Sequence, residues 1–183
     1  MTLCHLFYRS VPTLWRPALL VLLLLLLAAC RVPGQREGEV LPFETIEQQG
    51  SSGTGGLYES EQPTFHVLTS AEQVDQLARL VTAEAQMHLS ALDYDEVVVV
   101  VVFQGWKPTN GYGVEVEQVV RRGNRVVVEA QFTERNPEMA AADEETSPYH
   151  VVAVSKAGEW GEDVRFLLHA EGQVVQEQTY FIP

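Results

Sequence analysis

Cys30 has the residue type and the neighbours with the clearest chemistry in this chain. It follows Leu27-Ala28-Ala29 and an apolar run that lies behind Arg9 and Arg16. A positive flank, a short apolar segment and small residues before a cleavage point are typical of a secretory signal. A cysteine directly after that point fits the bacterial lipoprotein signal, in which the thiol receives a diacylglycerol. We therefore predict a lipoprotein signal peptide over residues 1–29 and a lipid on Cys30.

An uncleaved membrane helix and a plain signal peptide are the alternatives to lipidation. The apolar run Ala18–Ala29 contains 12 residues, whereas a helix needs about 20 apolar residues to cross the hydrocarbon layer. Pro17 precedes the run, and a longer helix would draw Arg16 into the lipid. Cleavage and acylation with palmitate therefore remain the expected outcome.

The composition limits the partners of the mature chain. The sequence has 25 acidic and 12 basic side chains, a formal net charge of −13. Such a domain is repelled by phosphate backbones and by anionic lipid head groups. We therefore exclude nucleic acid as a partner and expect the lipid to be the membrane attachment. Besides Cys30, the only cysteine is Cys4 in the predicted signal, so disulfides and thiolate chemistry are excluded as well.

The remaining polar side chains show no catalytic or metal-binding spacing. The histidines of the predicted domain fall on separate elements, at His66, His88, His150 and His169, without the pairing of a zinc site. His150 stands in an alternating strand, where we expect it to be at an edge or exposed. The run Asp143-Glu144-Glu145 lacks the alternating ligands and the glycine of a calcium loop. We predict no enzyme activity, no metal and no cofactor, with a hydrolase as the weakest alternative.

A tether and an edge strand are predicted after the lipidated cysteine. Residues 30–40 lack helical or strand periodicity and read as a flexible tether, and residues 41–183 suit a single domain. Leu41–Gln48 is expected to form a first edge strand, which the glycine and serine cluster Gly50–Gly56 ends.

One helix is predicted to cover the core. Thr64–Leu68 is a short strand candidate, and Ser70 with Gln73 three residues later has the arrangement of a capping box. The helix is expected to run to about Leu89, because apolar residues recur at helical spacing at Val74, Leu77, Ala78, Val81 and Ala85.

Strands dominate the rest of the chain. Val97–Phe103 is apolar at every position and predicts a central strand that is covered on both faces. Val114, Val116 and Val120 are expected to share one face of the next strand, which turns back at Arg121–Asn124. Three later strands are predicted at Tyr149–Ser155, Val164–His169 and Gln173–Phe181. Short turns favour antiparallel pairing, so we predict an α+β fold: a mostly antiparallel sheet, sandwich or half-barrel like, with one packed helix.

One loop departs from simple alternation and is the candidate binding element. It consists of Gly105, Trp106, Lys107, Pro108, Thr109, Asn110, Gly111 and Tyr112. Pro108 fixes its own backbone angle and Gly111 accepts a positive φ, so the loop is expected to be rigid. A rigid loop with aromatic side chains loses little entropy when a partner binds. The alternative is that Trp106 and Tyr112 fold back to cover the sheet edge.

Two separated stretches, Phe103–Tyr112 and Ser147–Lys156, resemble the signature stretches of the PrcB C-terminal domain family. That pattern is a valine-rich strand, a Gly-x-Lys-Pro-Thr-x-Gly-Tyr loop, a hairpin and a later Pro-Tyr-x-Val-Val strand. The resemblance covers about residues 64–156. It implies an exported protein, because the family's namesake is a non-catalytic lipoprotein subunit that supports the protease of a bacterial surface complex. Trp106 and Asn110 occupy variable positions of the pattern, so the resemblance assigns them no role.

The same loop supports a second interpretation. Lys107–Tyr112 is similar to the Asn-Pro-Thr-Thr-Gly-Tyr or Phe loop of chagasin-type peptidase inhibitors, although Lys107 replaces the asparagine and Asn110 a threonine. We favour a lipid-anchored interaction or accessory subunit on the outer face of a bacterial membrane. Its expected partner is another exported protein, with a surface protease as the specific candidate.

Overall fold

The computed structural model describes residues 38–49, 58–138, 140 and 142–183. Glu37–Pro183 form one compact unit. The predicted signal peptide, the predicted lipidation site Cys30 and the predicted tether up to residue 37 lie outside the described residues. Within the described ranges, no helix is long and apolar enough to cross a membrane.

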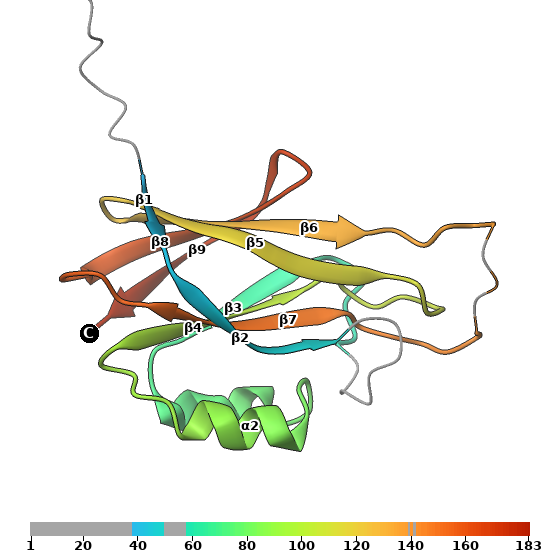
Figure 1. Cartoon of the computed structure of the whole chain (residues 1–183), viewed down its shortest axis with the longest axis horizontal. Coiled ribbons are helices and arrows are strands. Elements are labelled where there is room, and N and C mark those ends of the chain that lie inside the picture. The colour runs from blue at the N-terminus through green and yellow to red at the C-terminus, as the bar shows by residue number, and fades with distance from the viewer. Residues whose placement is uncertain (1–37, 50–57, 139, 141) are drawn as a thin grey trace, which may run out of the picture. The chain divides into compact units, whose positions relative to one another are not determined.

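Two β-sheets pack face to face, and a helical layer covers one of them (Figure 1). The first sheet has the order β1 (Glu39–Leu41), β5 (Gly113–Arg122), β6 (Arg125–Thr133), β8 (Gly161–Ala170) and β9 (Gln173–Ile182). The second has the order β2 (Phe43–Gln49), β7 (Tyr149–Ser155), β4 (Val97–Phe103) and β3 (Thr64–Leu68). All neighbours run antiparallel except β6 and β8. The predicted α+β, mostly antiparallel fold is confirmed in its sandwich form.

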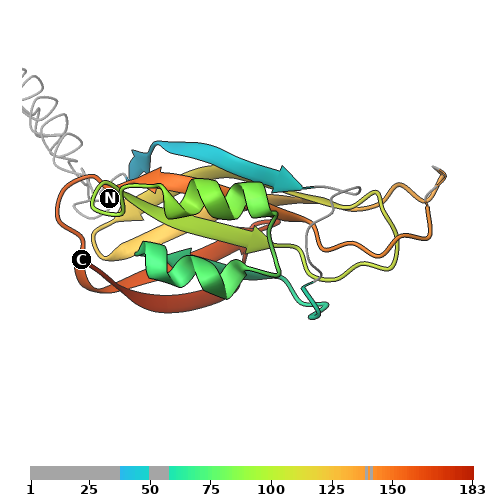
Figure 2. The same cartoon turned by 90° about the horizontal axis from the view of Figure 1, so that it is seen from below.

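Strand β4 lies inside the second sheet and is covered on both faces, as its unbroken apolar sequence predicts. Val98, Val100 and Val102 enter the core between the two sheets. Val99, Val101 and Phe103 enter a second core under the helices, which lie across this sheet in Figure 2. A strand with core on both sides has no solvent face, and this explains why polar residues do not alternate in it.

Two short helices replace the single helix that was predicted. A 3₁₀ helix, η1, covers Ala71–Leu77, and the α-helix α2 covers Ala83–Ser90. The helical conformation is interrupted at Thr82. The backbone of this residue is extended, and its Oγ1 accepts a hydrogen bond from the Ala85 N–H at 3.2 Å. This side chain starts a new helix, because an extended N-cap residue satisfies a free N–H of the first turn.

The predicted apolar face of the helical region is buried in spite of the interruption. Its buried members are Val74, Leu77, Val81 and Ala85, whereas Ala78 is exposed. The predicted capping box does not form, since Ser70 makes no side-chain cap bond. Gln73 instead accepts the backbone N–H of Thr69 at 2.7 Å.

The first predicted edge strand is also divided in two. Leu41 ends β1 in the first sheet, and Phe43 begins β2 in the second, with Pro42 between them. Proline has no N–H to donate to either ladder, so the chain changes sheets there. Leu41 is 1% exposed and fixes the crossing in the core. Because β1 begins at Glu39, the predicted tether is shorter than residues 30–40.

The β5–β6 hairpin turns where it was predicted, but its alternation shifts. Arg122 pairs with Arg125 across the turn, and Gly123 has a φ of +64°. A bulge between Val116 and Gln118 then changes the side-chain register, so that Val119 is buried instead of Val120. One extra residue in a strand moves all following side chains to the opposite face.

The strand at Tyr149–Ser155 has the predicted bounds, and the last two strands extend slightly beyond them. The chain leaves β6 through residues 134–148 and enters β7 in the other sheet, before β8 returns beside β6. This long excursion permits the parallel pair, because parallel neighbours need a crossover rather than a tight turn.

Candidate functional site

The 105–112 loop joins β4 to β5 at one end of the sandwich (Figure 1, Figure 2). It runs directly into Gly113, the first residue of β5, whereas Glu39 of β1 pairs with Arg121 toward the other end of that strand. Eight residue steps separate these positions on β5, or about 26 Å at ~3.3 Å per residue. The loop and the described beginning of the chain therefore lie at opposite ends of the domain.

A direct backbone contact requires glycine at position 105. Gly105 has a φ of +93°, and a Cβ atom there would lie 2.4 Å from the carbonyl oxygen of Glu61. The next residue continues the contact, since the Trp106 N–H donates to the Ser60 carbonyl at 2.8 Å. No residue with a side chain fits this approach, so the start of the loop is fixed against residues 60–61.

The other flank of the loop is held by the 134–148 connection. Lys107 and Thr146 exchange two backbone hydrogen bonds, at 2.8 and 2.9 Å. The Asn110 side-chain oxygen accepts the Ala142 N–H at 3.1 Å. A loop bonded to separate chain segments on both flanks has few conformations available, which agrees with the rigidity expected from its proline and glycines.

The loop side chains differ in exposure. Pro108 and Gly111 are exposed, and Trp106 and Tyr112 are half-buried. The Lys107 Nζ lies 5.3 Å from the centroid of the Tyr112 ring, a cation–π arrangement. Trp106 and Tyr112 thus pack against the domain and still present part of their surface, which combines features of the binding and the packing interpretations.

The surface beside the loop is acidic. Exposed carboxylates of the 134–148 connection come from Glu134, Glu138, Asp143, Glu144 and Glu145. Lys107 is the single charged residue of the loop itself. Within the described part of the chain, no group of three or more His, Cys, Asp or Glu side chains is arranged to hold a metal ion.

The prediction that His150 would be at an edge or exposed was wrong. His150 is 2% exposed, and its Nδ1 accepts the Val116 N–H at 2.8 Å. Nε2 lies 2.9 Å from the Thr45 hydroxyl; since Nδ1 is an acceptor, the neutral ring donates from Nε2. Burial lowers the pKa of His150, while the nearby charge of Glu115 opposes that shift. The imidazole therefore joins β7 to β2 and to β5 of the facing sheet.

Glu47 is a structural acid that sequence reasoning missed. Its carboxylate accepts hydrogen bonds from the Tyr149 hydroxyl at 2.7 Å and the Thr82 hydroxyl at 2.6 Å. These contacts connect β2, β7 and the start of α2. Burial, followed by the bond to Glu47 and its charge, raises the pKa of Tyr149. No spacing rule brings Glu47 and Tyr149 together, because they lie 102 residues apart.

Sequence reasoning identified the loop but not the segments that hold it. Ser147 both accepts the Tyr58 N–H and donates to the Tyr58 carbonyl, each at 3.0 Å. This pair of bonds fastens the segment that precedes Ser60. The only available signal was Ser147-Pro148, which lies in the second family-like stretch, while nothing in the sequence singled out Tyr58.

The loop, the hairpin after it and the strand that carries His150 form one continuous stretch from β4 to β7. Residues 98–155 match the family model PrcB C-terminal. This match confirms the resemblance and includes the 105–112 loop together with its partner Thr146. The PrcB C-terminal stretch excludes β8, β9 and both helices. No curated protein and no solved structure matches the chain.

Proposed function

We propose that this chain is a lipid-anchored, non-catalytic accessory subunit on the outer face of a bacterial membrane. It binds another exported protein through the 105–112 loop, and a surface protease is the partner class that the PrcB C-terminal match suggests. The anchor is the lipid on Cys30, which follows the signal-like sequence of residues 1–29.

The observation that carries this proposal is the double attachment of the loop. Gly105 lies against residues 60–61, and Lys107 is paired with Thr146, so the loop geometry is set before a partner arrives. Preorganisation reduces the entropy lost on association. Pro108 and Gly111 stand exposed at the loop surface. The loop also lies at the end of the domain opposite Glu39 of β1, so a partner bound at the loop does not meet that strand.

Crosslinking in cells tests the proposal. A photoreactive amino acid at Pro108 should yield one dominant crosslinked exported protein, identified by mass spectrometry. The matched control is the same amino acid at Met87, which is 69% exposed on α2. Failure to crosslink at Pro108, or the same product from Met87, would contradict binding through the loop.

Two further measurements separate the remaining interpretations. Cys30→Ala should abolish palmitate labelling and processing, and normal processing would contradict the anchor. An inhibitor of the chagasin type would slow a papain-like protease, with the effect lost in Gly111→Glu. For an accessory subunit we expect no inhibition at about micromolar concentration, a range in which a specific inhibitor binds.

A further inference from the structure

Strand β9 is a long sheet edge with apolar side chains in solvent. It covers ten residues, Gln173–Ile182, and pairs on one side only, with β8. Val174, Val175 and Phe181 are 54%, 37% and 61% exposed. An edge strand offers a row of unpaired backbone groups to any extended chain, so edges of this length normally carry protective features.

The other edge strands of the described domain are short or irregular, whereas most of β9 is long and regular. Strand β1 has three residues and β3 has five. Strand β2 carries a bulge and the exposed charge of Glu44. In β9 the bulge lies at one end, beside Val175, and residues 176–180 pair regularly with β8.

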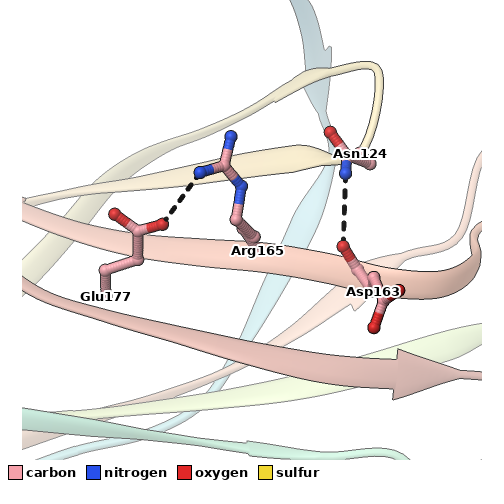
Figure 3. Close-up of polar contacts among 4 residues, drawn as sticks. All are labelled: Asn124, Asp163, Arg165 and Glu177. Carbon is pink, nitrogen blue, oxygen red and sulfur yellow. Dashed lines mark hydrogen bonds and ion pairs between the residues drawn. The ribbon is translucent and has the colours of Figure 1, made fainter.

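The single charged residue of β9 is neutralised within the sheet. Glu177 forms an ion pair with Arg165 of β8 at 3.2 Å, shown in Figure 3 beside the Asn124 contact to the Asp163 carbonyl. Unpaired charges on an edge strand discourage the docking of other strands. Because the Glu177 charge is paired with a neighbour on its own sheet, it gives β9 little of that protection.

A cavity borders each end of β9. The first, about 290 Å³, is lined by Val174 and Val175 with Glu134, Glu171 and Lys107. The second, about 520 Å³, is lined by Phe181 with Asp95, Glu96, Glu159 and Lys156. The Lys156 ammonium already donates to the carbonyls of Tyr94 and Pro183. Acidic side chains exceed basic ones at both ends of the strand.

We propose that β9 binds an extended segment of another protein as an added strand, with apolar side chains alternating with basic ones. Backbone hydrogen bonds to the edge provide affinity, and the two cavities accept side chains near the ends of the segment. Val174 and Phe181 are seven residues apart, about 23 Å at ~3.3 Å per residue, so an added strand of about eight residues reaches both. The net charge of −13 opposes a second copy of this chain as the occupant.

Peptide binding to the full-length chain in detergent tests this surface. The probe is a fluorescein-labelled ten-residue peptide of alternating valine and lysine, measured by anisotropy at about 0.15 M salt, where weak long-range attraction is screened. We expect saturable binding, and much weaker binding of a valine and glutamate peptide. Phe181→Lys and Val174→Lys should each weaken binding by about tenfold or more, because they remove an anchor and add a like charge.

Met87→Lys is the matched control, since it makes the same change of charge at an exposed site on α2. Its affinity for the peptide should equal that of the wild type. Hydrogen exchange should show peptide-dependent protection in Gln173–Ile182, and any protection within the 105–112 loop should be confined to Lys107, which lines the first cavity.

Four results would overturn the strand-docking surface. They are no binding of the valine and lysine peptide, an equal loss of affinity in Met87→Lys, peptide-dependent protection that leaves out β9, and protection of β9 that rises with protein concentration in the absence of peptide. The last would assign the edge to a second copy of this chain.

Discussion

The 105–112 loop and strand β9 are two accessible surfaces built on opposite principles. The loop is bonded on both flanks, with Gly105 against Glu61 and Lys107 paired with Thr146. Strand β9 has a backbone ladder on one side only, although its Gln176 side chain contacts β3, and it leaves Val174 and Phe181 in solvent. The loop belongs to the PrcB C-terminal stretch, whereas β9 lies outside it. One surface has a geometry set by the fold, and the other can complete its pairing with an added chain.

Mutations at the two surfaces should therefore affect different properties: the stability of the domain at the loop, and association at β9. Changing a residue that fixes the loop should destabilise the whole domain, because the backbone of two other segments must move. Changing an exposed residue of β9 should leave the fold intact and affect association alone. The effects below run from the largest to the smallest and sharpen or break this contrast.

Gly105→Ala should have the largest effect. The added Cβ would meet the Glu61 carbonyl at 2.4 Å, in a backbone conformation that disfavours side chains. We expect a loss of about 3 kcal/mol in the free energy of unfolding, measured with urea. Gly158→Ala is the matched control, since Gly158 has a φ of +66° with open space around its Cβ position. It should cost about 1 kcal/mol, the conformational penalty alone.

His150→Leu should have the next largest effect, because it leaves the buried Val116 N–H without an acceptor. This amide lies near the end of β5 that follows the loop. We expect a loss of about 2 kcal/mol at pH 7.5. An unchanged urea midpoint would show that the imidazole does not join the sheets.

The free energy of unfolding of the wild type should also decrease as the pH is lowered below about 6.5, the ordinary pKa of histidine. The folded protein holds the pKa of His150 below that value, so the unfolded chain binds more protons as pH falls. His150→Leu should reduce the slope between pH 7.5 and 5.5. A residual slope is expected because burial lowers the pKa of His66 as well. An identical slope in the variant would contradict the neutral, buried ring.

Gln176→Ala should cost less, about 1 kcal/mol. On the β9 side, the Gln176 side-chain oxygen accepts bonds from the Thr64 hydroxyl at 2.8 Å and the Phe65 N–H at 3.0 Å. These amide contacts close the sandwich between β3 and β9 without a titratable group. The loss in the free energy of unfolding should therefore be the same at pH 7.5 and 5.5. A pH-dependent loss would contradict the expected difference between the Gln176 contacts and the titratable His150 ring.

Phe181→Lys should have the smallest effect, within about 0.5 kcal/mol of the wild type. The side chain is 61% exposed, so its replacement removes little packing. Urea unfolding measures this directly. A large loss would mean that Phe181 supports the fold and would weaken its assignment to a docking surface.

Periodicity predicted most of the strands because the order of apolar and polar residues in a strand reflects which of its faces are buried. Val97–Phe103 is apolar throughout because cores lie on both of its faces. The helical spacing of apolar residues predicted less. It located the buried face but not the interruption at Thr82, where a local cap competes with continuation of the helix.

The remaining features depend on contacts across the fold. His150 is buried because the bulge in β5 leaves the Val116 N–H facing its ring, a tertiary contact that no local pattern contains. Likewise, the alternation in Gln173–Phe181 predicts a strand, but its place at the edge follows from sheet order. The loop was recognisable by Pro108 and its glycines, whereas its partner residues came from distant segments.

The most direct test of the preorganised loop is residue-resolved amide hydrogen exchange in the free protein. The amides of Trp106, Lys107 and Thr146 donate to backbone carbonyls at 2.8 to 2.9 Å. They should exchange as slowly as amides of β4, and far more slowly than the amide of exposed Gly158. Exchange of Trp106 and Lys107 at the rate of Gly158 would show that the loop is not held before a partner binds, and would contradict the account.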